Sequence, residues 1–202
     1  MFPTDDSRPA PAAGATPLKK QPVPADLAEI VRQQFGDGFV LATHRTDSTV
    51  KYLHPPKETD WVMFLTGDLD GDNIEDAVIV ARNPKPLDGQ GKYGYKVIDP
   101  YFTYHGYGDP KITSTMMSED PTQQSVVLII HGAGAEGWRA AKPKSKFVAI
   151  NLPFDSLSFS QVKNRKKMVP ALNLASHDTS SSVIYWDGKK YRWRETAGLA
   201  GL

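Results

Sequence analysis

The spacing of apolar residues changes near residue 36, from a helical stripe to short continuous runs. Asp26 followed by Glu29 resembles a capping box, and Gly36 is typical of the residue after a helix. The pattern predicts a helix over 26–35. Its apolar stripe consists of four residues: Leu27, Ile30, Val31 and Phe35.

Beyond Gly36 the apolar residues gather in short runs that are rich in β-branched and aromatic side chains, which is typical of strands. Four runs are continuously apolar, at 61–65, 77–81, 126–130 and 147–150. Continuous runs indicate strands covered on both faces, so we expect the helix at 26–35 to cover one face. The predicted fold class is mainly β (α+β), with an antiparallel sheet and an N-terminal covering helix.

Turn residues place a hairpin near the C-terminus and leave longer stretches without a regular pattern. Asp187-Gly188 separates two aromatic-rich runs, as in a tight hairpin. Stretches 83–92, 105–123 and 164–181 are predicted to be mainly irregular, with short elements hidden in some of them. A basic cluster at the start of the third stretch has no interleaved aromatic residues, which indicates a solvated loop rather than a phosphate site. It comprises Lys163, Arg165, Lys166 and Lys167.

The 202 residues divide into a tether and one domain. Residues 1–24 contain six prolines among Ala, Gly and Asp, which predicts an extended, disordered tether. Residues 25–202 are long enough to form a single β-rich globular domain without disulfides.

Charge and cysteine content exclude several classes of function. With 24 Lys and Arg against 23 Asp and Glu, the net charge of +1 disfavours nucleic-acid binding. The absence of cysteine excludes thiol catalysis and thiolate metal sites. No apolar run approaches the ~20 residues of a membrane span, and the first residues lack the pattern of a signal peptide. A leader removed during export would be compatible with this sequence.

The stretch 66–83, TGDLDGDNIEDAVIVARN, concentrates carboxylates in one turn. Between Glu58 and Arg82 no Lys or Arg neutralises them. Oxygens at alternate positions of a tight loop converge on its interior, where Ca²⁺ takes six to eight oxygen ligands. The carbonyl of Ile74 is a further expected ligand, and Glu75 is expected to point to solvent. The alternative is an Asp-rich turn that is merely well solvated. The predicted carboxylate ligands are Asp68, Asp70, Asp72 and Asp76.

An EF-hand does not fit, because Asn73 and Ile79 stand where that loop has Gly and Glu, and strands flank the turn. The pattern DLDGDNIEDAVIV instead resembles the calcium loop of FG-GAP and VCBS repeats, the integrin-type propeller units. The resemblance covers 66–81 in a single copy. It implies a blade-like hairpin with Ca²⁺ held by Asp68, Asp70, Asp72, Asp76 and the Ile74 carbonyl.

The glycine-rich stretch HGAGAEGW at 131–138 permits two enzyme interpretations. Gly132, Gly134 and Gly137 match the dinucleotide fingerprint, but too few residues separate the flanking strands for a crossover helix. The stretch also resembles the oxyanion loop of α/β-hydrolases, yet the chain has no G-x-S-x-G nucleophile elbow. The simplest prediction is a strand, a glycine loop and one short helix around Trp138 leading into another strand.

Other candidate groups give weaker indications. The five histidines show no zinc-ligand spacing. Tyrosines in 93–107 could stack on sugars or on a partner protein, or simply pack a strand edge. The sequence therefore predicts a non-catalytic, calcium-stabilised module of an exported bacterial protein, located outside the cytoplasm in the periplasm or secreted, with a protein or glycan partner. A hydrolase or nucleotide-binding enzyme centred on HGAGAEGW is the alternative.

Overall fold

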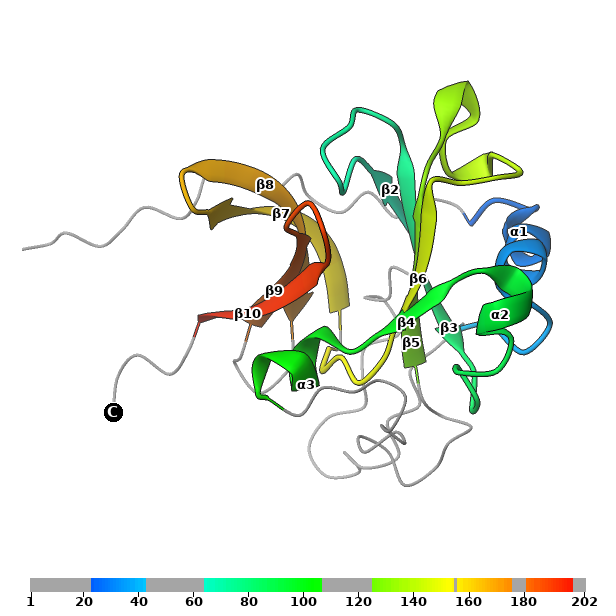
Figure 1. The fold of residues 1–202 in the computed structure, drawn as a ribbon, viewed down its shortest axis with the longest axis horizontal. Coiled ribbons are helices and arrows are strands. Elements are labelled where there is room, and N and C mark those ends of the chain that lie inside the picture. The colour runs from blue at the N-terminus through cyan, green and yellow to red at the C-terminus, as the bar shows by residue number, and fades with distance from the viewer. Residues whose placement is uncertain (1–22, 43–63, 107–124, 155, 176–180, 198–202) are drawn as a thin grey trace, which may run out of the picture.

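The computed structural model describes residues 23–42, 64–106, 125–154, 156–175 and 181–197 (Figure 1). The tether predicted for 1–24 lies almost entirely outside these residues. No helix within the described ranges is long and apolar enough to cross a membrane. The elements in chain order are α1 (Leu27–Phe35), β1 (Val40–Leu41), β2 (Phe64–Gly67), β3 (Asp76–Arg82), α2 (Gln90–Tyr93), β4 (Lys96–Ile98), α3 (Pro100–Tyr104), β5 (Ser125–His131), the 3₁₀ helix η2 (Gly134–Arg139), β6 (Ser145–Ala149), β7 (Ser156–Asn164), β8 (Lys167–Ala175), β9 (Ser181–Trp186) and β10 (Tyr191–Ala197).

The first sheet has six strands, ordered β1-β3-β5-β6-β4, with β2 also paired to β3. All its pairs are antiparallel except β4 with β6, which run parallel. The mainly β, antiparallel fold class is thus confirmed, with one parallel pair that the sequence pattern did not indicate. The parallel pair arises because the chain passes through α3 and a long connection before returning along β5 and β6.

The second sheet has four strands, ordered β10-β9-β8-β7, and every neighbouring pair is antiparallel. The predicted Asp187-Gly188 hairpin joins β9 to β10, and Gly188 has the positive φ of 95° that such a turn requires. The prediction of a mainly irregular stretch at 164–181 was wrong, because β8 occupies Lys167–Ala175. Pro170, which cannot donate to a strand ladder, hides this strand in the sequence.

Three layers make up the molecule, with the six-stranded sheet between α1 and the four-stranded sheet (Figure 1). Alternate residues of β3 face opposite sides: Ile79 lies in the cluster under α1, and Val78 and Val80 lie in the cluster shared with the second sheet. Strands β3 and β5 are therefore buried on both faces, as their continuous apolar runs predict. Of the run at 61–65, only the part from Phe64 onward is described.

Helix α1 packs Leu27, Val31 and Phe35 against the outer face of the first sheet. The expected capping box is absent, because the Asp26 side chain accepts no capping hydrogen bond. Glu29 instead accepts hydrogen bonds from Arg32 and Gln33 on the helix surface. The helix ends at Gly36, whose φ of 101° turns the chain away.

Candidate metal centre in the acidic loop

The acidic stretch forms the loop between β2 and β3. The two strands are antiparallel and close on the pair Gly67 with Asp76, so residues 68–75 form a compact turn. Gly71 and Asn73 have φ values of 82° and 65°. Asn tolerates this left-handed conformation well, so Asn73 can adopt it although it is not a glycine.

Asp68 and Asp72 shape this loop through its own backbone. Asp68 Oδ1 accepts hydrogen bonds from the amides of Gly71 at 2.7 Å and Asp72 at 3.1 Å, and its Oδ2 accepts from Asn73 at 2.9 Å. Asp72 Oδ1 accepts from the amide of Ile74 at 2.9 Å. These bonds turn the carboxylate of Asp68 inward, because the donors all lie on the curved backbone around it.

Asp76 joins the loop to the neighbouring strand β5. Its side chain is buried, with Oδ2 accepting from the amide of Leu69 and Oδ1 from that of Gly132, both at 2.8 Å. Burial raises the pKa of Asp76 to about 6, and the charge of Asp70 adds to this against the opposing effect of the backbone donors. A cation beside Asp76 would remove this penalty on its ionised form.

Three of the predicted ligands converge. Carboxylate oxygens of Asp68, Asp70 and Asp76 all lie within 4.8 Å of one another. The Oδ1 atom of Asp70 is buried and has no hydrogen-bond partner among the described residues. Asp72 lies outside this group of three, and it accepts a hydrogen bond from the amide of Ile74, the residue whose carbonyl is the fifth predicted ligand. The arrangement thus presents a set of carboxylate oxygens, the ligands that Ca²⁺ prefers, and one of these oxygens has no hydrogen-bond partner among the described residues.

A lysine from outside the acidic stretch contacts this loop. Lys144 Nζ is 2.7 Å from both Asp70 Oδ2 and Asp72 Oδ2. These hydrogen bonds raise the pKa of Lys144 and lower that of Asp72. Lys144 comes from the β5–β6 connection, so the residues next to the loop in the sequence give no sign of it.

A buried polar chain runs beneath the loop. His131 Nδ1 lies 3.4 Å from Asp70 Oδ2 and 3.0 Å from Ser145 Oγ, and its Nε2 lies 2.6 Å from the Tyr191 hydroxyl. Burial lowers the pKa of His131, which favours the neutral ring. These polar contacts link both sheets to the loop. No feature of the local sequence around His131 indicates them.

The glycine-rich stretch packs against this loop and forms no crossover. It connects β5 to β6, which are antiparallel, through the six-residue η2. A Cβ on Gly132 would overlap the carbonyl oxygen of Glu75. Trp138 Nε1 donates to Glu75 Oε2 at 3.0 Å, so the exposed Glu75 is not simply directed to solvent as expected. The glycines allow a close approach between two backbones.

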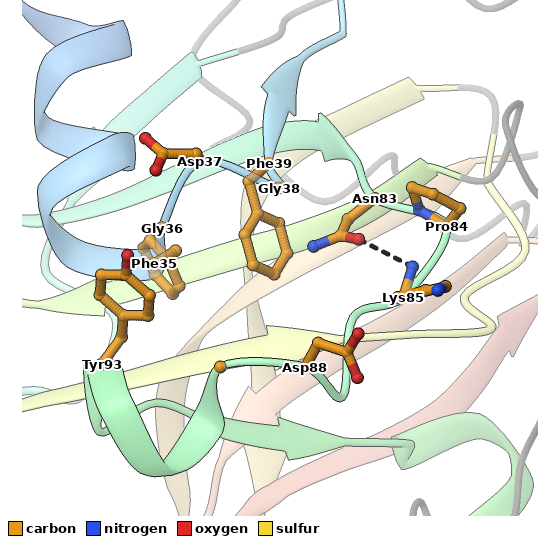
Figure 2. A pocket seen from close by; sticks show the side chains of 11 residues that line it. Phe35, Gly36, Asp37, Gly38, Phe39, Asn83, Pro84, Lys85, Asp88 and Tyr93 are labelled. Carbon is orange, nitrogen blue, oxygen red and sulfur yellow. Dashed lines mark hydrogen bonds between the residues drawn. The ribbon is translucent and has the colours of Figure 1, made fainter.

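A shallow pocket of about 420 Å³ lies elsewhere, between the turn after α1 and the segment 83–89 (Figure 2). Phe35, Phe39 and Tyr93 form its apolar part, and Asn83 Oδ1 accepts from the amide of Lys85 at 2.7 Å. None of the predicted site residues lines this pocket. It therefore adds no group to the acidic loop.

Comparisons of the chain with models of protein families, with curated proteins and with solved structures gave no match. The assignment of a function therefore rests on the chemistry of the site.

Proposed function

We propose that the chain is a non-catalytic, calcium-stabilised β-rich module of an exported protein, with a binding or envelope role. The observation that carries the calcium assignment is the convergence of Asp68, Asp70 and Asp76 around a buried oxygen of Asp70 that has no partner among the described residues. An unpaired buried carboxylate oxygen is costly, and a cation would satisfy it.

Calcium fits the proposed site better than magnesium. A turn of this length offers oxygens from Asp68, Asp70, Asp72 and Asp76, and the Ile74 carbonyl completes the proposed set. Ca²⁺ accepts six to eight oxygens in irregular geometry, whereas Mg²⁺ demands a near-ideal octahedron and retains its waters. Water molecules would complete the coordination of Ca²⁺ on the exposed side of the loop.

Lys144 is a competitor for the same oxygens. Its ammonium contacts Asp70 Oδ2 and Asp72 Oδ2, so calcium would have to displace it. The Lys144 side chain is 50% exposed and has a flexible stem, so the ammonium can move into water at a small cost. Competition with this internal cation lowers the affinity for Ca²⁺. A site that binds Ca²⁺ only in the millimolar range suits an extracellular protein.

The geometry around HGAGAEGW gives less support to the enzyme alternative. Residues 131–139 do not line the pocket beside α1. The one histidine of this stretch, His131, is 1% exposed and its ring nitrogens face Tyr191, Ser145 and Asp70. A substrate could not reach it without opening the core.

Calorimetric titration of Ca²⁺ into metal-stripped protein tests the proposal. We expect saturable binding of one ion, weaker binding of Mg²⁺, and loss of binding in Asp70→Asn. Asp37→Asn is the matched control, because it makes the same chemical change at a side chain that is 78% exposed, outside the loop. Absence of binding at millimolar Ca²⁺ in a folded protein would reduce the loop to a turn neutralised by Lys144.

A further inference from the structure

Basic side chains gather at the ends of the two hairpins of the second sheet. Residues 163–167 and 187–195 carry eight Lys and Arg against only Asp187 and Glu195, in a chain whose total net charge is +1. These two segments therefore carry a net charge of +6, and the rest of the chain is net negative. The eight are Lys163, Arg165, Lys166, Lys167, Lys189, Lys190, Arg192 and Arg194.

Four of the eight line a hollow of about 640 Å³ that also contains aromatic rings: Arg165, Lys189, Arg192 and Arg194. Tyr104, from α3, is 58% exposed, and its ring centroid lies 4.9 Å from that of Trp193. Trp193 is 8% exposed, and its Nε1 is buried without a hydrogen-bond partner in the described part of the chain. The hollow thus combines an exposed aromatic ring with a buried indole donor that has no described partner, and a buried unsatisfied polar group is unusual in a native structure.

The guanidinium groups of this hollow differ in how far they are already paired. Arg192 Nε donates to Asp187 Oδ2 at 2.6 Å, so that charge is neutralised. Arg194 donates one nitrogen to the Lys163 carbonyl and lies over the Tyr185 ring, which fixes its position, and no carboxylate among the described residues pairs with it. Arg165 has a φ of 57° in the β7–β8 turn, a conformation that costs about 1 kcal/mol or more in a residue other than glycine.

We propose that this hollow binds an acidic polysaccharide, with a sugar ring against Tyr104 and carboxylates paired with Arg165 and Arg194. The proposal names the partner class for the binding role above and rests on that role. Tyr and Trp rings offer apolar faces to sugar rings with a polar group at the edge, and Arg pairs with carboxylates in bidentate geometry. One widely exposed ring, that of Tyr104, suits a sugar unit better than a strand of nucleic acid, which requires a row of stacking rings.

The test is calorimetric titration of a hyaluronan hexasaccharide, which carries three carboxylates, into the whole chain at low salt. Saturable binding is expected, with at least a tenfold loss in Tyr104→Ala and in Arg194→Gln. Lys142→Gln, which removes one positive charge outside the hollow, is the matched control and should change the affinity less than twofold. Isomaltohexaose, a neutral hexasaccharide, should not bind.

Three results would overturn the proposal: no saturable binding of the hexasaccharide, an equal loss in Lys142→Gln, or equal binding of isomaltohexaose. Tighter binding of a thymidylate tetramer, with three phosphodiester charges and the same sensitivity to Tyr104→Ala, would assign the hollow to nucleic acid instead. The acidic loop contributes no residue to this hollow. Repeating the titration in Ca²⁺ and in EGTA therefore separates failure of this proposal from failure of the calcium site.

Discussion

At the scale of single residues, Lys144 decides how strongly the acidic loop depends on a metal ion. We predict that Lys144→Met binds Ca²⁺ at least tenfold more tightly than the wild type, because no ammonium has to leave Asp70 and Asp72. Without metal the same variant should be less stable, since like charges then remain unneutralised.

Calorimetry and thermal unfolding in EGTA would measure both effects. Lys142→Met is the appropriate control, because Lys142 lies in the same connection and is exposed. An unchanged Ca²⁺ affinity in Lys144→Met would show that the ammonium and the metal do not share a position.

A second residue-scale prediction concerns Asp187 in the β9–β10 turn. Partial burial opposes its ionisation, but the hydrogen bonds from Arg192 and two backbone amides outweigh this and lower the pKa to about 2. The folded-state pKa lies below the unfolded value of about 4. The stabilisation is therefore complete above pH 4 and is lost as the pH falls toward 2.

This contribution is at most about 2.7 kcal/mol, since each pKa unit corresponds to about 1.36 kcal/mol. Urea unfolding of the wild type and Asp187→Asn between pH 5 and pH 2 should show a stability difference that narrows across this window. A difference that stays constant with pH would mean that the charge of Asp187 contributes nothing.

The local pattern of the acidic loop could be predicted, and its long-range partners could not. Carboxylates at alternate positions between two apolar runs specify a tight turn, because nearest neighbours in the chain determine it. Lys144, His131 and Tyr191 reach the loop only through the pairing of distant strands. A sequence pattern that describes neighbours carries no information about that pairing.

At the scale of elements, the connection between β5 and η2 depends on the absence of a side chain at Gly132. A Cβ there would meet the backbone of Gly137 at 2.7 Å and overlap the carbonyl of Glu75. We predict that Gly132→Ala destabilises the protein by about 1 to 3 kcal/mol, as overpacking against a backbone does.

Gly134→Ala is the companion variant. A Cβ on Gly134 meets no atom within 4 Å, so only its φ of 59° opposes the change, at a cost of about 1 kcal/mol. Denaturant unfolding would rank the two. If Gly134→Ala proved the more damaging, close packing would not be the reason for Gly132.

Among the elements, those with a continuous apolar run and the short run that forms β4 could be located from sequence, whereas β7 and β8 could not. Strand β8 carries Pro170 and begins at Lys167 within a basic turn, so its pattern resembles a loop. Strand β7 has only three apolar residues among nine and gains its place by pairing with β8. Short or edge strands depend on their partners more than on their own composition.

At the scale of the whole molecule, calcium should stabilise the entire protein against unfolding and not only the loop. Asp76 bonds the loop to β5 at Gly132, so a bound ion would be coupled to the central sheet. Binding to the native state alone adds about 2.7 kcal/mol at a hundredfold excess over Kd. We predict that EGTA lowers the melting temperature, and that Asp76→Ala abolishes this sensitivity. A calcium-dependent change confined to the amides of 68–76 in hydrogen exchange would contradict the coupling.

The contrasting connectivity of the two sheets has a consequence for the order of folding. Strands β7 to β10 pair in chain order, so each step closes a short loop, whereas the bond from Gly132 to Asp76 spans 56 residues. Short closures cost less entropy and are formed sooner. The four-stranded sheet should therefore belong to the folding nucleus, and Val183→Ala should mainly slow refolding in stopped-flow experiments. Asp76→Asn, in the late-forming junction, should mainly accelerate unfolding.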